Sequence, residues 1–121
     1  MFDNVKIGGQ SVPMLSLASV DYYYTQIFHE DPIKIQTRQN DLDEGDMVEL
    51  MSKMGFVMAK FAELKDRKKM RELNFDDYLE WLDQFDRAEF LEALGDIGTI
   101  YAGQNITHTT EKKSNDQQID Q

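Results

Sequence analysis

Residues 46–64 read DMVELMSKMGFVMAKFAEL, and this stretch predicts how the rest of the chain is organised. It contains no proline, it is long enough for about five helical turns, and Asp46 stands at its start as an N-cap. At about 100° per residue, large side chains form one stripe and small side chains form a second. The large ones are Met47, Leu50, Met51, Met54, Val57, Met58, Phe61 and Leu64, and the small ones are Ser52, Gly55, Ala59 and Ala62. We therefore expect a central helix that is covered from two sides, with its methionines in the core.

The composition restricts the class of protein. The chain has 121 residues, of which 40% are hydrophobic, and this suits one domain with a modest core. The net charge of −10 argues against a nucleic-acid partner, whose backbone is also anionic. The absence of cysteine excludes disulfides, thiolate zinc sites and cysteine nucleophiles. Without an apolar run of about 18 residues or a secretory signal, we expect no contact with membranes and a cytoplasmic protein.

The N-terminal residues predict a β-hairpin. Short runs of strand-forming residues, 5–7 and 12–17, flank the pair Gly8-Gly9. Pro13 has no backbone N–H, so the second strand should lie at a sheet edge. A lone hairpin is marginally stable in water, and we expect this one to pack on the helices.

Three further helices are predicted around the central one. The first spans residues 20–30 and is ended by Pro32. The second spans residues 75–85 after the cap Asn74, and its expected core face is Phe75, Tyr78, Leu79, Leu82 and Phe85. The third follows the cap Asp86, has Glu89 in the capping-box position, and ends at Gly103. Residues 38–45 are expected to be a polar loop, and the basic run 65–71 is expected to complement the dipole at the end of the central helix.

The predicted fold class is thus α+β and mainly α. A short N-terminal hairpin packs on a bundle of about four helices within residues 1–103. Residues 104–121 have the polar composition of a disordered tail.

The sequence predicts neither a catalytic site nor a metal or cofactor site. Acidic residues at 41–46 suggest calcium, but glycine and glutamate are missing from the positions that a calcium loop requires. His29 and His108 are far apart in the sequence and have no neighbours at metal-ligand spacing. Asp76, Asp77 and Glu80 share the polar side of their helix, which is typical of a solvated face. We therefore expect a binding protein rather than an enzyme.

Three aromatic residues lie away from the apolar stripes of their helices. Phe56 is the only large apolar side chain on the polar arc of the central helix, among Glu49, Lys53 and other polar residues. Tyr22 lies opposite the core face of its helix, and Trp81 lies at the border of its own. We predict that Phe56, Tyr22 and Trp81 are exposed and contribute to contacts with a partner or between copies of the chain.

The order and spacing of several segments resemble a known family. These segments are Tyr24 with IFHED at 27–31, LMSKMGFVMAK at 50–60, YLEWLDQF at 78–85, and Ile100-Tyr101 at the end of the last helix. Over roughly residues 5–101 the chain resembles the tail assembly chaperones of long-tailed phages that infect Gram-positive bacteria.

This resemblance implies a function. Such chaperones bind the long, helical tape-measure protein and keep it soluble in the host cytoplasm while the tail tube forms, and they are absent from the finished virion. The major tail tube protein and a second copy of the chain are further candidate partners. A longer form made by ribosomal frameshifting is typical of the family, and Lys112-Lys113 is compatible with a slippery codon run.

Three other functions remain open. A small acidic adaptor that binds a host protein would have the same charge and the same lack of a catalytic site. A minor structural component of the tail would remain in purified virions. An enzyme that uses Asp76, Asp77 or Glu80 would need these carboxylates to be buried, whereas the helical pattern places them outside.

Overall fold

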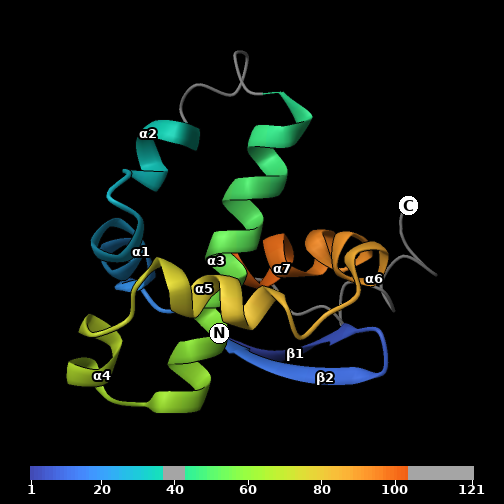
Figure 1. The fold of residues 1–121 in the computed structure, drawn as a ribbon. Coiled ribbons are helices and arrows are strands. Elements are labelled where there is room, and N and C mark those ends of the chain that lie inside the picture. The colour runs from blue at the N-terminus through green and yellow to red at the C-terminus, as the bar shows by residue number, and fades with distance from the viewer. Residues whose placement is uncertain (37–42, 104–121) are drawn as a thin grey trace, which may run out of the picture.

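The structure is a computed structural model that describes residues 1–36 and 43–103 (Figure 1). The elements are β1 (Phe2–Ile7), β2 (Gln10–Leu15), α1 (Val20–Phe28), α2 (Pro32–Gln36), α3 (Glu44–Leu64), α4 (Arg67–Arg71), α5 (Phe75–Leu82), α6 (Arg87–Glu92) and α7 (Leu94–Tyr101). The predicted fold class is confirmed, because an N-terminal hairpin packs on a mainly helical body. The predicted tail and most of the predicted loop 38–45 lie outside the described residues.

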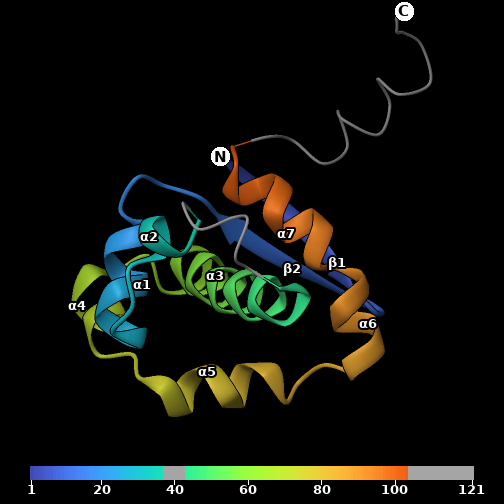
Figure 2. The same ribbon diagram turned by 90° about the horizontal axis from the view of Figure 1, so that it is seen from above.

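Helix α3 is the centre of the fold, as its sequence predicts. It has 21 residues, and Figure 2 shows α1, α5, α7 and the hairpin arranged around it. Its start differs from the prediction, because the N-cap is Asp43, whose Oδ1 accepts the backbone N–H of Asp46 at 2.8 Å. Asp46 completes the capping box by accepting the N–H of Asp43 at 3.3 Å. The reciprocal cap offsets the low helix propensity of Gly45, so the N-cap lies three residues earlier than expected.

Both predicted stripes of α3 pack in the core. On the large stripe, Leu50, Met54, Val57, Met58 and Phe61 are all buried. On the small stripe, Gly55 lets α7 approach so closely that a Cβ added to it would lie 3.0 Å from Cδ1 of Ile97. The methionines are therefore mainly structural, and Met47 in the first turns is the one that stays exposed.

The hairpin has the predicted turn and edge. Ile7 pairs with Gln10 across Gly8-Gly9, and Gly8 has a φ of 63°, which a type II′ turn requires at its first central position. Met1 and Ser16 exchange two backbone hydrogen bonds, of 3.0 and 2.8 Å. Hydrogen-bonded pairs alternate along an antiparallel ladder, so Pro13 lies at a position whose missing N–H would point away from β1. The proline therefore removes no hydrogen bond between the two strands.

Three helix boundaries differ from the sequence prediction. Helix α1 ends at Phe28 rather than at residue 30, because His29 follows it with a φ of 59°. Helix α5 ends at Leu82 rather than at residue 85. The single helix expected after Asp86 is two helices, α6 and α7, which meet at Ala93. Helix α3 ends at Leu64, as predicted, and Lys65 follows it with a φ of 52°. Asp66 then caps the separate helix α4, which places Met70 in the core and its basic side chains outside.

Glu89 has a different role from the predicted capping box. Its backbone N–H donates to Asp86 at 3.2 Å, but no reciprocal bond is formed. Its carboxylate lies against the hairpin turn instead, where a Cβ added to Gly8 would meet Oε1 at 2.3 Å. The turn glycine therefore serves both the backbone conformation and the packing of α6 on the hairpin.

The last helix is tied to the first two by a polar contact. The Tyr101 hydroxyl donates to Oδ1 of Asp21 at 2.7 Å and accepts from Nε2 of Gln36 at 2.9 Å. Burial and the nearby Asp21 raise the pKa of Tyr101 to about 12. Among the described helices, none has the length and the apolar character needed to cross a bilayer.

Candidate protein-interaction surface

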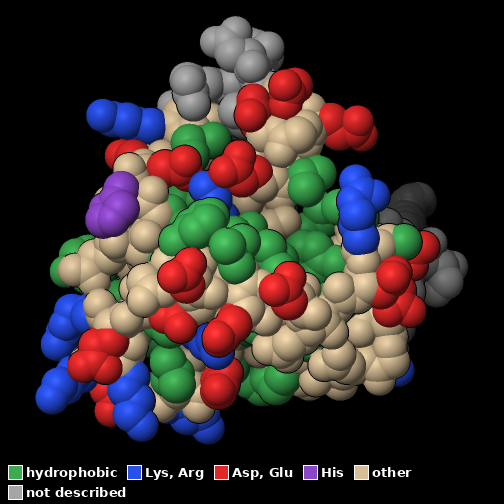
Figure 3. All heavy atoms as spheres, viewed as in Figure 1, with side chains coloured by type: hydrophobic (Ala, Val, Ile, Leu, Met, Phe, Trp, Pro, Cys, Tyr) green, Lys and Arg blue, Asp and Glu red, His purple; other side chains and the backbone are tan. Residues whose placement is uncertain are grey.

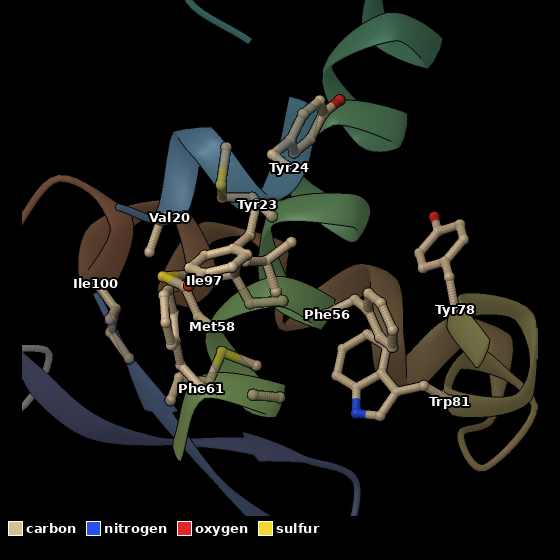
Figure 4. Packing of buried hydrophobic residues seen from close by; sticks show 14 of the residues in the cluster. Val20, Tyr23, Tyr24, Phe56, Met58, Phe61, Tyr78, Trp81, Ile97 and Ile100 are labelled. Atoms are coloured by element: carbon tan, nitrogen blue, oxygen red, sulfur yellow. The ribbon is translucent and has the colours of Figure 1, made fainter. Parts of the chain in front are cut away.

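The structure buries two of the three predicted contact residues. Phe56 has no exposed surface, so the expectation that it lies on the exposed side of α3 is wrong. Its ring contacts those of Tyr78 and Trp81, at centroid distances of 5.6 and 5.9 Å (Figure 4). It also contacts the ring of Phe28, at 6.3 Å. The physical reason is that α5 packs over the arc of α3 that the sequence assigned to solvent.

Trp81 and Tyr22 lie in different environments. Trp81 is 5% exposed, and its ring contacts Phe85 at 5.1 Å and Phe90 at 5.7 Å. Tyr22 is 57% exposed on α1, where its ring meets the edge of Tyr23 at 5.3 Å. The structure thus brings Phe56 and Trp81 together inside the domain and leaves Tyr22 outside. Within the described residues, no ring contact joins Tyr22 to either of them.

An ion cluster around the buried Lys53 explains why the arc of Phe56 looked polar in the sequence. The Lys53 side chain is 6% exposed, and its Nζ lies 2.7 Å from Oε2 of Glu49 and 3.2 Å from Oε1 of Glu30. The same oxygen of Glu30 accepts a hydrogen bond from the Tyr24 hydroxyl at 3.1 Å. The buried Lys53 ammonium therefore joins α3 to the residue after the end of α1, while the carboxylates of Glu30 and Glu49 stay partly exposed.

The buried tyrosines of this region are held neutral. Burial, followed by the charge of Glu30, raises the pKa of Tyr24 far above its ordinary value. Burial also raises the pKa of Tyr78 to about 12, against a smaller opposing effect of its hydrogen bond with Ser52. The hydroxyls of Tyr24 and Tyr78 have hydrogen-bond partners in Glu30 and Ser52, so both tyrosines are structural residues of the core. In the described part of the chain, no group of three or more histidine and carboxylate side chains could hold a metal ion.

The best candidate for function is an apolar surface on α5. Phe75 and Leu79 are exposed by 49% and 42%, and they lie one turn apart on the same side of this helix. A pocket at the C-terminal end of α5 opens between α3, α5 and α6, and it is lined by Ser52, Leu82, Asp83, Phe85, Arg87, Phe90 and Leu91. We call Phe75, Leu79 and this pocket the α5 surface. Figure 3 shows hydrophobic side chains gathered in this region, over α5 and the helix behind it.

The α5 surface exists because α5 is rolled relative to the predicted orientation. The sequence predicts a core face that includes Phe75 and Leu79, whereas the buried residues of α5 are Tyr78 and Trp81. Burying an indole and a phenol removes more surface from water than burying Phe75 and Leu79 would. Phe75 is still held in place, because its ring contacts Phe28 at 6.3 Å and Tyr78 at 5.6 Å.

Acidic residues border this apolar row. Asp76, Glu80 and Asp83 are exposed and share one side of α5, next to the side that carries Phe75 and Leu79. Arg87 is the single basic residue that lines the pocket. Acidic side chains also surround the hydrophobic area of Figure 3.

Sequence reasoning missed Phe75 and Leu79 as surface residues, although a signal was present. Helix α5 and the turn after it carry five apolar residues besides Trp81, which is more than one buried stripe of a short helix can hold. Large exposed hydrophobic residues occur elsewhere as well, namely Met1, Phe2, Leu17, Tyr22, Ile33 and Met47. The α5 surface differs from these because Phe75 and Leu79 form a row of two exposed side chains one helical turn apart, next to the exposed carboxylates of Asp76 and Glu80.

Comparison with known proteins identifies no relative of this chain: no family model, no curated protein and no solved structure matches it.

Proposed function

We propose that this chain is a phage tail assembly chaperone that binds the tape-measure protein in the host cytoplasm. The order of sequence segments described above motivates the proposal. The observation that carries it furthest is the α5 surface, an exposed apolar row with a pocket at the C-terminal end of the same helix, on a body with a net charge of −10. A chaperone for a helical client needs such a surface, and its charge keeps the complex from aggregating.

In this function the α5 surface covers apolar stretches of the client until the tail tube encloses them. The major tail tube protein is a second candidate partner, because it meets the client at that stage. Self-association through Tyr22 on α1 is a further candidate contact, since this residue is 57% exposed. Phe56 and Trp81 support the surface from inside the core and are not proposed as contacts. No catalytic activity and no cofactor are part of the proposal.

The decisive experiment is co-expression with the tape-measure protein encoded near the gene for this chain. The expected result is that the client becomes soluble and co-purifies with the full-length chain, while the client expressed alone precipitates. The variant Leu79→Asp should abolish this effect, and Ile33→Asp, which alters a somewhat more exposed aliphatic residue on α2, should leave it intact. If the unaltered chain neither solubilises nor retains the client, the proposal is wrong.

Two measurements separate the alternatives. A minor structural component of the tail would be found in purified virions, where a chaperone should be absent. An adaptor for a host protein would act when expressed without any phage partner.

A further inference from the structure

We propose that the α5 surface binds amphipathic helices whose apolar stripe is bordered by lysine and arginine. This inference rests on the proposed function, because it names the kind of client segment that the chaperone recognises. Beyond that function, particular residues of the α5 surface are assigned to recognition, and helices with acidic borders are predicted to bind weakly.

The apolar part of the surface suits the side of a helix. Phe75 and Leu79 are spaced by four residues, and the pocket bordered by Leu82 and Leu91 continues the row toward α6. A helix that is laid beside α5 presents anchors at three- and four-residue intervals, which match a row of this spacing. Phe75 is supported by Phe28 and Tyr78, so little side-chain freedom is lost when a partner covers it.

The charges around the row select the partner. Ion pairs in the described part of the chain involve Lys53 with Glu30 and Glu49, and Lys60 with Glu63. None of these pairs uses Asp76, Glu80 or Asp83, so the acidic border of α5 forms no ion pair with a lysine or arginine of residues 1–36 and 43–103. Lysine or arginine beside the apolar stripe of a partner would complement this border, whereas aspartate or glutamate would be repelled.

The same charges exclude two other classes of partner. The headgroups of anionic lipids and the phosphates of nucleic acids would meet the carboxylates of Asp76, Glu80 and Asp83 without an opposing basic cluster. Arg87 alone does not offset them. A basic amphipathic helix satisfies both the apolar row and its acidic border.

The test uses two labelled peptides of about 18 residues, long enough to form a helix when bound. Both carry the same leucine stripe, which is bordered by lysine in one and by glutamate in the other. Fluorescence anisotropy with the full-length chain should show binding of the lysine peptide and at least tenfold weaker binding of the glutamate peptide. The affinity for the lysine peptide should fall about tenfold between low and high salt, because screening shortens the range of the charges.

Two pairs of variants locate the site. Glu80→Lys should weaken binding of the lysine peptide about tenfold and strengthen binding of the glutamate peptide. Glu44→Lys changes the net charge equally, but it lies eight residues and about 12 Å along α3 from Ser52 at the pocket, so it should change both affinities less than twofold. Leu79→Asp should abolish binding of both peptides, and Ile33→Asp should leave binding unchanged. Circular dichroism of each variant verifies that the fold is retained.

Equal binding of the two peptides, or equal effects of Glu80→Lys and Glu44→Lys, would overturn the inference. These outcomes are distinguishable from failure of the proposed function. If the unaltered chain solubilises the tape-measure protein while the glutamate peptide binds as well as the lysine peptide, the chaperone function stands and the charge selection is wrong. If the lysine peptide binds selectively but the client stays insoluble, the surface is assigned correctly and its natural partner is another protein.

Discussion

Replacing Gly55 by alanine is predicted to lower the free energy of unfolding, although alanine is the better helix former. Gly55 lies in the middle of α3, where the change alone should stabilise the helix by about 0.5–1 kcal/mol. The new methyl group, however, would lie 3.0 Å from Cδ1 and 3.3 Å from Cγ2 of Ile97 on α7. Ile97 is fully buried, and its branched side chain is stiff at χ1, so it cannot move aside freely.

The balance of the two effects gives the magnitude. Adding a methyl group to a well-packed core costs about 1–3 kcal/mol. After the gain in helix propensity of about 0.5–1 kcal/mol is subtracted, the net loss should be about 0–2.5 kcal/mol. In a domain of this size, each kcal/mol corresponds to a fall in Tm of about 4–8 °C. Urea titration followed by circular dichroism, together with a thermal scan, measures both quantities.

Gly95 provides the matched control for this prediction. It lies in the first turn of α7, and a Cβ added there would meet no atom within 4 Å. Gly95→Ala should therefore raise the free energy of unfolding by up to about 0.5 kcal/mol, since only helix propensity changes. The same chemical substitution thus has opposite effects at two sites because of what lies next to each.

A double-mutant cycle identifies the contact that is responsible. Ile97→Val removes the Cδ1 methyl that Gly55→Ala would meet, and alone it should cost about 0.5–1.5 kcal/mol. In the double variant the alanine methyl fills part of that space, so the combined loss should be at least about 1 kcal/mol smaller than the sum. If Gly55→Ala stabilises the chain, or if the two losses are additive, the close approach of α3 and α7 is wrong.

Further predictions follow from the placement of the aromatic residues. Phe56→Ala should cost about 3–5 kcal/mol, because it empties a fully buried site, whereas Tyr22→Ala on the surface should stay within about 0.5 kcal/mol; urea titration of both variants measures this. Equal effects would contradict the burial of Phe56. Burial keeps Tyr78 and Tyr101 neutral with pKa values of about 12, so their stabilising effect is complete below the ordinary pKa of 10 and is lost as the pH rises toward 12. The loss of stability above pH 10, followed by circular dichroism, should be smaller for Tyr78→Phe, and an unchanged pH profile would exclude Tyr78 as a cause.

Local patterns in the sequence were sufficient for much of the fold. The hairpin turn at Gly8-Gly9 follows from the backbone freedom of glycine, and the edge position of Pro13 follows from its missing N–H. The long central helix and its two packed stripes follow from helical periodicity. Each of these features depends on residues that are neighbours along the chain, so no knowledge of distant segments was needed.

The tertiary structure alone decided which polar and aromatic residues face the solvent. Lys53 counts as polar in any helical pattern, but its side chain is buried and paired with Glu30 from a different segment, and the aromatic rings of α5 cover Phe56 beside it. Periodicity could likewise find the apolar residues of α5, but it could not say which of them are buried. That depends on which side chains, here Tyr78 and Trp81, fill the space beside α3, and it leaves Phe75 and Leu79 on the surface. A helix's own sequence determines the angles between its side chains, while the roll of the helix against its neighbours is determined by the packing of the whole core.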